Sequence, residues 1–224
     1  MIKAVILDFD DTLCLTEAAC FALENETLLA MGRKPMSREV HKRTWGKPLF
    51  EAMLERSPGI DVGKFREVFA PILKRYTDEG KLDYIDDQNY KALDALSAIN
   101  KELVILTSRT HTEVEHLMAP DHALAERIET FYYKDNMQYH KPDPRAFRHI
   151  EEAHGWKPDE CVYVGDSLSD ALAAKGAGMH FIACLESGLR TKADFEQQSD
   201  APVDAYITHF SDIVAAVKRL SLAA

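Results

Sequence analysis

The chain has 224 residues, 46% hydrophobic and 29% charged, a composition typical of a soluble globular protein and not of a disordered or repeat protein. Its 27 basic and 37 acidic residues give a formal net charge of −10, which argues against general binding of nucleic acid or anionic membranes. The four cysteines form no C-x-x-C pair, so neither a zinc motif nor a redox motif is indicated. No apolar run exceeds six residues and the N-terminus leads directly into a strand, so we expect a cytoplasmic protein without a membrane span or signal peptide.

The first expected element is a short apolar strand at 4–7, which ends in three carboxylates, Asp8, Asp10 and Asp11. A continuous apolar run of this length is typical of a strand buried on both faces of a parallel sheet. Ligands bind at the carboxyl ends of such strands, but aspartates after a strand also commonly begin a polar turn. Taken alone, this stretch leaves both interpretations open.

A segment with helical patterns and no convincing strand follows, at 15–84. Thr16 can cap a helix whose small or apolar residues recur at three- and four-residue spacing: Cys20, Leu23, Thr27 and Met31. Further helices are expected over 37–44, 48–56 and 61–79, separated by proline and glycine. We therefore expect an inserted α-helical domain at 15–84 within a core domain made of 1–14 and 85–224.

Strand and helix patterns alternate in the remainder of the chain. Strands are expected at 103–106, 131–133, 161–164, 180–185 and 205–208, and helices at 89–100, 112–118, 144–154, after Asp170 and at 211–220. Asp143 suits the N-cap of the third of these helices and Pro144 its first position. Repeated units of this length predict an α/β fold, a doubly wound parallel sheet covered by helices on both faces.

Three of the apolar strands lead into polar residues. The first is followed by Asp8, the second by Thr107 and the third by Gly165-Asp166. Because parallel strands bring their carboxyl ends to one edge of the sheet, these residues are expected to lie close together. If Asp166 begins the next helix, Asp170 faces the same side of its first turn. Each residue could also be an ordinary strand end or helix cap, but their joint order favours one site.

Several carboxylates at one edge of a sheet predict a bound cation. Those expected there belong to Asp8, Asp10, Asp166 and Asp170. Close carboxylates repel one another, and a hard cation with oxygen ligands relieves the repulsion; Mg²⁺ suits carboxylates combined with phosphate. Lys141 and the Thr107 hydroxyl would supply donors for phosphate oxygens, although Lys141 could also be a solvated surface lysine.

These stretches resemble the four ordered motifs of the haloacid dehalogenase-like hydrolase superfamily. The matching residues are Asp8-x-Asp10-x-Thr12, Thr107-Ser108, Lys141-Pro142 and Gly165-Asp166-Ser167-x-x-Asp170. The helical insertion lies where one branch, which includes phosphoglycolate phosphatase and β-phosphoglucomutase, carries its cap domain. The resemblance therefore implies a Rossmann-like core with an inserted helical cap, and it extends from Asp8 to at least the turn at 176–179.

The resemblance also implies a role for the residues around Asp8. Asp8 would be the nucleophile that forms an aspartyl-phosphate, and Asp10 the acid/base that protonates the leaving oxygen and later activates water. Asp11 occupies a position where the superfamily often has glycine, and we expect it to be a turn residue. Because the dehalogenases lack an acid at the position of Asp10, phosphoryl transfer is favoured over carbon–halogen cleavage.

The remaining motif residues would bind phosphate and metal. Thr107, Ser108 and Lys141 would hold the phosphoryl group. Asp8, the backbone carbonyl of Asp10, and Asp166 would hold Mg²⁺. Asp170 would help to hold the metal directly, through water, or through Lys141.

Substrate choice is expected to depend on basic residues outside these motifs. Residues 33–47 hold six basic side chains and one acid, Glu39. We hypothesise that Arg43 and Lys47 attract an anionic phosphoester, although a solvated helix face is the simpler alternative. The turn at 45–49 resembles the cap loop that approaches the active site in phosphoglycolate phosphatase-like members. Arg109 could contact a second anionic group of the substrate, cover the core surface, or pair with an acid.

The sequence thus predicts a Mg²⁺-dependent phosphatase for a small phosphorylated metabolite, acting as a monomer or homodimer. A phosphomutase of the β-phosphoglucomutase type would use the same motifs, and a non-catalytic binding protein could retain the fold. A response-regulator receiver also combines Asp, Thr and Lys around Mg²⁺, but receivers are shorter and lack an insertion after the first strand. The substrate's identity and the choice between hydrolysis and isomerisation stay open at this point.

Overall fold

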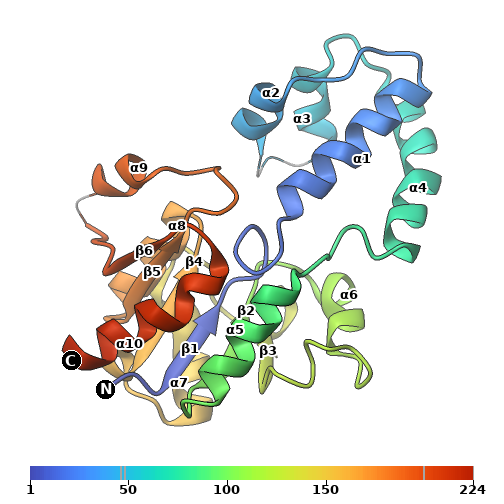
Figure 1. Cartoon of the computed structure of the whole chain (residues 1–224). Helices are drawn as coiled ribbons and strands as arrows, with labels where there is room; N and C mark the ends of the chain where they lie inside the picture. Colours follow the sequence, from blue (N-terminus) through green and yellow to red (C-terminus); the bar gives the residue numbers. More distant parts are fainter. Residues whose placement is uncertain (46, 48, 199, 224) are drawn as a thin grey trace. The chain divides into compact units, whose positions relative to one another are not determined.

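The computed structural model describes residues 1–45, 47, 49–198 and 200–223 and contains a six-stranded parallel sheet (Figure 1). The strands are β1 (Ala4–Leu7), β2 (Glu102–Leu106), β3 (Thr130–Tyr132), β4 (Cys161–Gly165), β5 (His180–Cys184) and β6 (Ala205–Ile207). Their order is β3-β2-β1-β4-β5-β6, and all these pairings are parallel. The predicted α/β fold with a doubly wound parallel sheet is confirmed.

Helices cover both faces of this sheet (Figure 1). The helices of the sheet-containing part are α5 (Asp87–Ser97), α6 (His111–Val114), α7 (Arg148–His154), α8 (Leu168–Gly176), α9 (Lys192–Glu196) and α10 (Ile213–Ala223). Alternate strand residues point to opposite faces, so Val5 packs in the cluster that contains α5 and α10. Ile6 packs in the cluster that contains α7 and α8. Among the described residues, none of the helices has both the length and the apolar character needed to cross a membrane.

The chain divides into two compact units. The first, here called the core unit, comprises Met1–Cys14 and Ile85–Ala224, and it contains the sheet. The second, the helical unit, comprises Leu15–Tyr84.

The helical unit is built from α1 (Thr16–Ala30), α2 (Arg38–Thr44), α3 (Leu49–Arg56) and α4 (Val62–Asp78). Its apolar core is formed by Leu28, Met36, Met53, Ile60 and Phe65. A charged cluster is also buried in it: His41 Nδ1 lies 2.5 Å from Glu17 Oε1, and Arg56 Nη1 donates to both Glu24 oxygens at 2.8 and 2.7 Å. The unit is therefore held together by ion pairs as well as by apolar contacts.

Helix α1 buries charged residues as well as the small and apolar residues that indicated it. Leu23 and Thr27 are buried, Cys20 and Met31 are only partly buried, and Glu17 and Glu24 are buried too. The sequence pattern counted only small and apolar side chains, whereas this helix also buries carboxylates that have cationic partners. Thr16 is the first residue of α1 and not its cap.

Several helices of the core unit also differ from expectation at their ends. The segment expected as one helix at 112–118 is α6 followed by a 3₁₀ turn, Glu115–Met118. The helix expected from Pro144 begins as a 3₁₀ turn, Pro144–Phe147, before α7, with the Asp143 side chain accepting a hydrogen bond from the Arg145 N–H. Helix α9 was not predicted, because in this short polar segment only Phe195 is buried.

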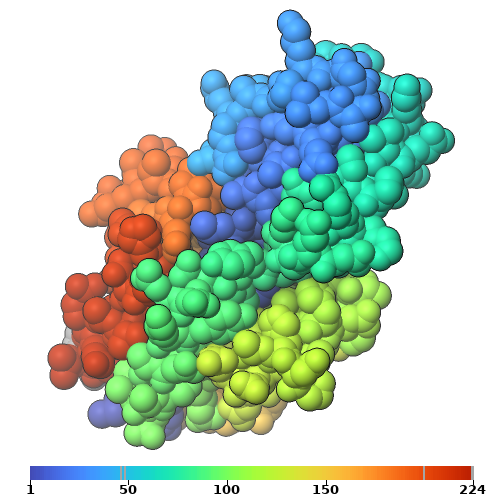
Figure 2. All heavy atoms as spheres, turned by 45° about the vertical axis from the view of Figure 1, so that its right-hand side comes forward, coloured from blue at the N-terminus to red at the C-terminus, as the bar shows by residue number. Residues whose placement is uncertain are grey.

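The connection between α6 and β3 packs against α5, as the adjoining green and yellow-green surfaces in Figure 2 show. Arg127 Nε donates to Asp94 Oδ1 of α5 at 2.7 Å, and its guanidinium carbon lies 5.1 Å from the centre of the Tyr90 ring. This contact fixes the segment that leads into β3, the neighbour of β2 in the sheet.

Candidate active site

Three buried aspartates lie together where β1 and β4 end. Asp8 follows β1, Asp166 follows β4 and Asp170 lies in the first turn of α8. One carboxylate oxygen of each lies within 4.8 Å of the others, and the residues are 7%, 8% and 0% exposed. The strand order reverses direction next to β1, which is the place where doubly wound sheets bind ligands. We call these residues the aspartate group.

The start of α8 holds Asp170 in this position. Ser167 is the N-cap, and its N–H and hydroxyl both donate to Asp170 Oδ2, at 3.0 and 2.6 Å. The condition that Asp166 begins the helix is therefore not met: the helix begins after Ser167, which forms a capping box with the acid three residues later. A Cβ on Gly165 would lie 2.6 Å from Asp170 Oδ2, so only glycine lets this carboxylate approach the end of β4.

Lys141 lies between two members of the aspartate group. Its Nζ is 3.0 Å from Asp8 Oδ1 and 2.7 Å from Asp170 Oδ1, and its side chain is 7% exposed. The ammonium also donates to the Tyr163 hydroxyl at 2.8 Å, and that hydroxyl lies 3.2 Å from the Leu106 carbonyl oxygen. Lys141 is thus a buried partner of the carboxylates and not a solvated surface lysine.

Sequence reasoning missed Tyr163. It lies inside β4 between aliphatic residues, so the strand pattern alone indicates only an apolar run. A tyrosine in a fully buried strand was a usable signal, because its hydroxyl needs a hydrogen-bond partner.

The electrostatics of the site favour a bound cation. Burial raises the pKa of Asp8, Lys141 lowers it, and the charges of Asp170 and Asp10 raise it, with a net result of about 7. Burial, followed by the charges of Asp170 and Asp8, also raises the pKa of Asp166 well above its usual value. Burial disfavours the charge on Lys141, but Asp170 and Asp8 outweigh this and hold its pKa well above the ordinary value. The charge of Lys141 is therefore not enough to offset the effect of burial on Asp8 and Asp166, whose pKa values stay raised.

The donor atoms of the aspartate group fit Mg²⁺. All of them are carboxylate oxygens, the ligands that hard cations prefer, and a divalent ion would remove the repulsion among them. The side chain of Asp10 is not part of this group, so a metal contact from Asp10 would have to come from its backbone carbonyl.

The Asp10 side chain instead forms an ion pair with Arg109. Arg109 Nε lies 3.1 Å from both Asp10 oxygens, and Nη2 donates to Oδ1 at 2.8 Å. The guanidinium carbon also lies 4.6 Å from the centre of the Phe9 ring. Of the three roles considered for Arg109, the structure shows the pairing with an acid, and the partner is a residue of the first motif.

Asp11 adopts a left-handed backbone conformation with φ of 56° and is buried. Aspartate is one of the few residues other than glycine that enter this region readily. Its N–H donates to the Cys14 carbonyl oxygen at 2.6 Å, so Asp11 forms the turn that follows β1.

Thr107 and Ser108 line a cavity beside Lys141. Its volume is about 170 Å³, and its other lining residues are Leu106, Lys134, Met137, Tyr139 and His140. Thr107 is buried, and its hydroxyl oxygen accepts a hydrogen bond from the Arg109 N–H at 3.2 Å. The hydroxyl hydrogen can therefore point to a bound group in this space.

Comparison with known proteins agrees with this geometry. Residues 5–184 match the family described as haloacid dehalogenase-like hydrolase. The chain belongs to this hydrolase family.

The relatives of this hydrolase include phosphoglycolate phosphatases. It is 27% identical over 229 residues to the phosphoglycolate phosphatase of Photobacterium profundum, which covers 97% of this chain and 96% of that protein. It is 29% identical over 215 residues to that of Nitrosospira multiformis, covering 90% and 91%. A putative β-phosphoglucomutase of Thermotoga maritima has the same fold, with a TM-score of 0.77 and 24% identity over 97% of this chain and 99% of that one.

The basic residues of the hydrolase's helical unit have different surroundings. Arg43 and Lys47 are exposed, and Lys47 pairs with Glu55 of α3. Arg33 instead donates to the Pro58 carbonyl oxygen, and Arg38 pairs with the buried Glu17. The basic stretch therefore contains structural residues as well as exposed ones. The turn at 45–49 includes residues 46 and 48, which lie outside the described residues.

Proposed function

We propose that this hydrolase is a Mg²⁺-dependent phosphatase that acts on a small phosphorylated metabolite through an aspartyl-phosphate on Asp8. The observation that carries the proposal is the placement of Asp8: it is buried at the end of β1 beside Lys141, and it shares a possible cation site with Asp166 and Asp170. The similarity along nearly the whole chain to proteins named phosphoglycolate phosphatase supports this reaction class.

In the first step, an Asp8 carboxylate oxygen attacks phosphorus. The bond between phosphorus and the ester oxygen breaks, and Asp10, protonated for this step, gives its proton to the leaving oxygen. In the second step, Asp10, now ionised, takes a proton from water. The water oxygen attacks phosphorus, the bond to Asp8 breaks, and inorganic phosphate leaves with Asp8 restored as a carboxylate.

The cation and the donors around Asp8 would stabilise the transferring group. Asp8, Asp166 and the Asp10 carbonyl would hold Mg²⁺, and bound Mg²⁺ would neutralise charge on the phosphoryl oxygens. Asp170 would act mainly through Lys141, because its Oδ1 contacts the ammonium and its Oδ2 accepts from the α8 cap. The Thr107 hydroxyl, Ser108 and Lys141 would donate to the phosphoryl oxygens.

The ion pair between Arg109 and Asp10 gives Arg109 a role in substrate choice. Arg109 donates to both oxygens of Asp10, the residue proposed to act as the acid and base. A substrate with a second anionic group, such as a carboxylate, would compete with Asp10 for Arg109. We therefore include Arg109 among the specificity residues of the proposed enzyme.

The helical unit would serve as a cap that selects the substrate. Arg43 and Lys47 are its candidates for attracting an anionic substrate, since both are exposed and basic. Replacing both with glutamate should raise KM for an anionic substrate and leave KM for a simple aryl phosphate closer to its original value. Unchanged kinetics with both substrates would remove these two residues from the proposal.

A panel of phosphorylated metabolites tests the proposed reaction. Purified protein with Mg²⁺ should release inorganic phosphate from at least one small phosphoester, with phosphoglycolate and sugar monophosphates included in the panel. Activity should disappear in EDTA and return with Mg²⁺. Conversion of a sugar monophosphate to its isomer without phosphate release would show a mutase, and binding without either reaction would show a non-catalytic protein.

A further inference from the structure

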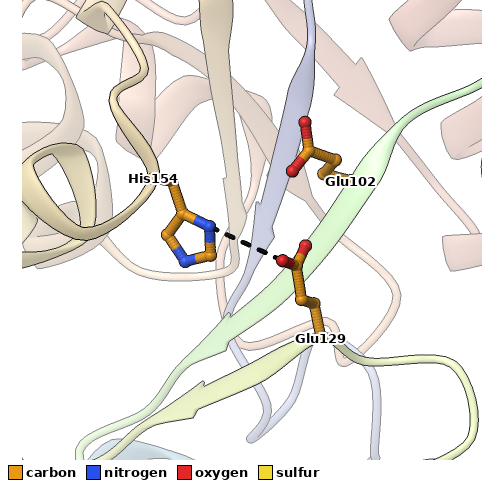
Figure 3. Close-up of side chains that lie close together, drawn as sticks. All are labelled: Glu102, Glu129 and His154. Carbon is orange, nitrogen blue, oxygen red and sulfur yellow. Dashed lines mark ion pairs between the residues drawn. The ribbon is translucent and has the colours of Figure 1, made fainter.

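A second group of potential metal ligands lies at the edge of the sheet where strands begin. The aspartate group lies at the opposite edge, where strands end. Glu102 begins β2, Glu129 immediately precedes β3, and His154 is the last residue of α7. One donor atom of each lies within 4.8 Å of the others. Figure 3 shows both carboxylates and the imidazole converging from these three elements. We call this group the edge site.

The imidazole of His154 is held in one orientation. Its side chain is 10% exposed, and its ring stacks on Trp156 with centroids 4.0 Å apart and an interplanar angle of 14°. Its Nε2 lies 2.9 Å from the Tyr132 hydroxyl. Its Nδ1 points toward Glu129 Oε1 at 3.9 Å, which is too long for a hydrogen bond (Figure 3). A nitrogen of this mostly buried ring is thus directed at the Glu129 carboxylate from beyond hydrogen-bond distance.

We propose that Glu102, Glu129 and His154 bind a divalent ion of the zinc type, with water as the fourth ligand. One imidazole nitrogen and two carboxylate oxygens form a donor set that zinc accepts and that Mg²⁺, which prefers oxygen ligands, does not favour. With Nε2 donating to the Tyr132 hydroxyl, Nδ1 presents its lone pair to the metal. A hydrogen bond from the second ring nitrogen is the outer support that metal-bound histidines commonly have.

The spacing of the edge site allows a metal to enter with small side-chain movements. Ligand atoms around a tetrahedral zinc ion lie about 3.4 Å apart, as follows from its bond lengths. The three donors of the edge site are already within 4.8 Å of one another, and both glutamates are exposed and free to change rotamer. The rigid His154 therefore sets the position, and Glu102 and Glu129 complete the coordination.

The bound ion would link β2, β3 and α7 at the edge of the sheet opposite the aspartate group. These elements are far apart in sequence, so a metal bound only by the folded chain stabilises the fold by mass action. This role is independent of the proposed phosphatase reaction.

Calorimetric titration of the full-length protein with zinc chloride, in excess Mg²⁺, tests the proposal. Under the proposed function, Mg²⁺ would occupy the aspartate group, so we expect one zinc site per chain and a higher melting temperature with zinc. Glu129→Gln together with Glu102→Gln should abolish both effects while leaving the stacked His154 in place. Tyr132→Phe should weaken zinc binding by about 10- to 100-fold, the range found for lost outer partners of metal ligands.

Two further variants serve as controls. His209→Ala removes an exposed histidine whose Nδ1 lies 3.8 Å from Glu186 Oε1, a similar pair that is not part of a three-donor group among the described residues. This variant should bind zinc like the wild type. Asp166→Asn should also retain the zinc site, because the aspartate group is separate. The proposal is overturned if zinc does not bind in excess Mg²⁺, if the double glutamine variant binds it normally, or if Asp166→Asn loses it.

Discussion

Replacing Lys141 with methionine removes a cation that contacts two buried carboxylates. Lys141 Nζ lies 3.0 Å from Asp8 Oδ1 and 2.7 Å from Asp170 Oδ1, and all three side chains are at most 10% exposed. Breaking a buried ion pair by removing one partner costs about 3–5 kcal/mol, because the other charge stays buried without compensation. We expect the free energy of unfolding of Lys141→Met to fall by about this amount when no metal is bound.

Urea unfolding in EDTA and in Mg²⁺ measures this effect. The loss should be largest in EDTA, and Mg²⁺ should recover part of it because the cation would compensate the same carboxylates. Lys74→Met is the matched control: Lys74 pairs with Asp78 at 2.7 Å, but both side chains are more than half exposed, so its removal should change stability little. Equal stability of the two variants in EDTA would refute the argument that Lys141 compensates buried charge.

The same variant should lose turnover. If Lys141 donates to the transferring phosphoryl group, Lys141→Met should lower kcat by about 10²- to 10³-fold, the effect of removing one preorganised donor. Activity in Mg²⁺, under conditions where the variant is folded, separates this loss from the loss of stability. Unchanged kcat would leave Lys141 a structural role only.

Three further substitutions test other parts of the structure. Gly165→Ala should raise the Mg²⁺ concentration needed for half-maximal activity, because its Cβ would displace Asp170 and with it Lys141, which contacts the proposed metal ligand Asp8. Burial lowers the pKa of His41, but the hydrogen bonds to Glu17 and Glu24 and the charge of Glu24 together outweigh this and raise the pKa above 6.5. Charged His41 therefore stabilises the fold fully below pH 6.5, the ordinary pKa of histidine. In urea unfolding, the wild type should have a higher free energy of unfolding than His41→Gln, and this difference should decline as the pH rises through the raised pKa. Arg109→Met should raise KM more for a substrate with a second anionic group than for an aryl phosphate.

Each of these expectations has a result that contradicts it. Normal Mg²⁺ dependence in Gly165→Ala would show that the position of Asp170 is not critical for the metal. A constant difference between wild type and His41→Gln across the pH range would show that the charge on His41 does not contribute. Equal changes in KM for both substrates would exclude Arg109 as a specificity residue.

The convergence of Asp8, Asp166 and Asp170 could be predicted from the strand pattern, whereas Lys141 follows no strand and only the family resemblance indicated its place. Apolar runs identified β1 and β4, and parallel strands bring their ends together whatever the length of chain between them. The fold class followed from the same alternation of strands and helices.

Contacts that depend on side-chain packing could not be predicted in this way. No local pattern connects Lys141 with Tyr163, which lies 22 residues away inside an apolar strand. The pairing of Arg109 with Asp10 likewise spans 99 residues, and the sequence left three roles for Arg109 open. The buried charges of α1 were missed for a related reason: Glu17 has the residue type of an exposed helix face, and only tertiary structure brings a partner to it.

The proposed reaction depends most directly on covalent attack by Asp8. Acid quenching during turnover of an aryl phosphate, followed by peptide mass spectrometry, should find the phosphoryl group on Asp8. Phosphorylated Asp8 should accumulate in Asp10→Asn. The aryl leaving group needs no proton in the first step, whereas the water in the second step still needs a base. Asp8→Asn should form no phosphorylated peptide and release no phosphate. Phosphate release by Asp8→Asn, or a phosphoryl group on another residue, would contradict the proposed mechanism.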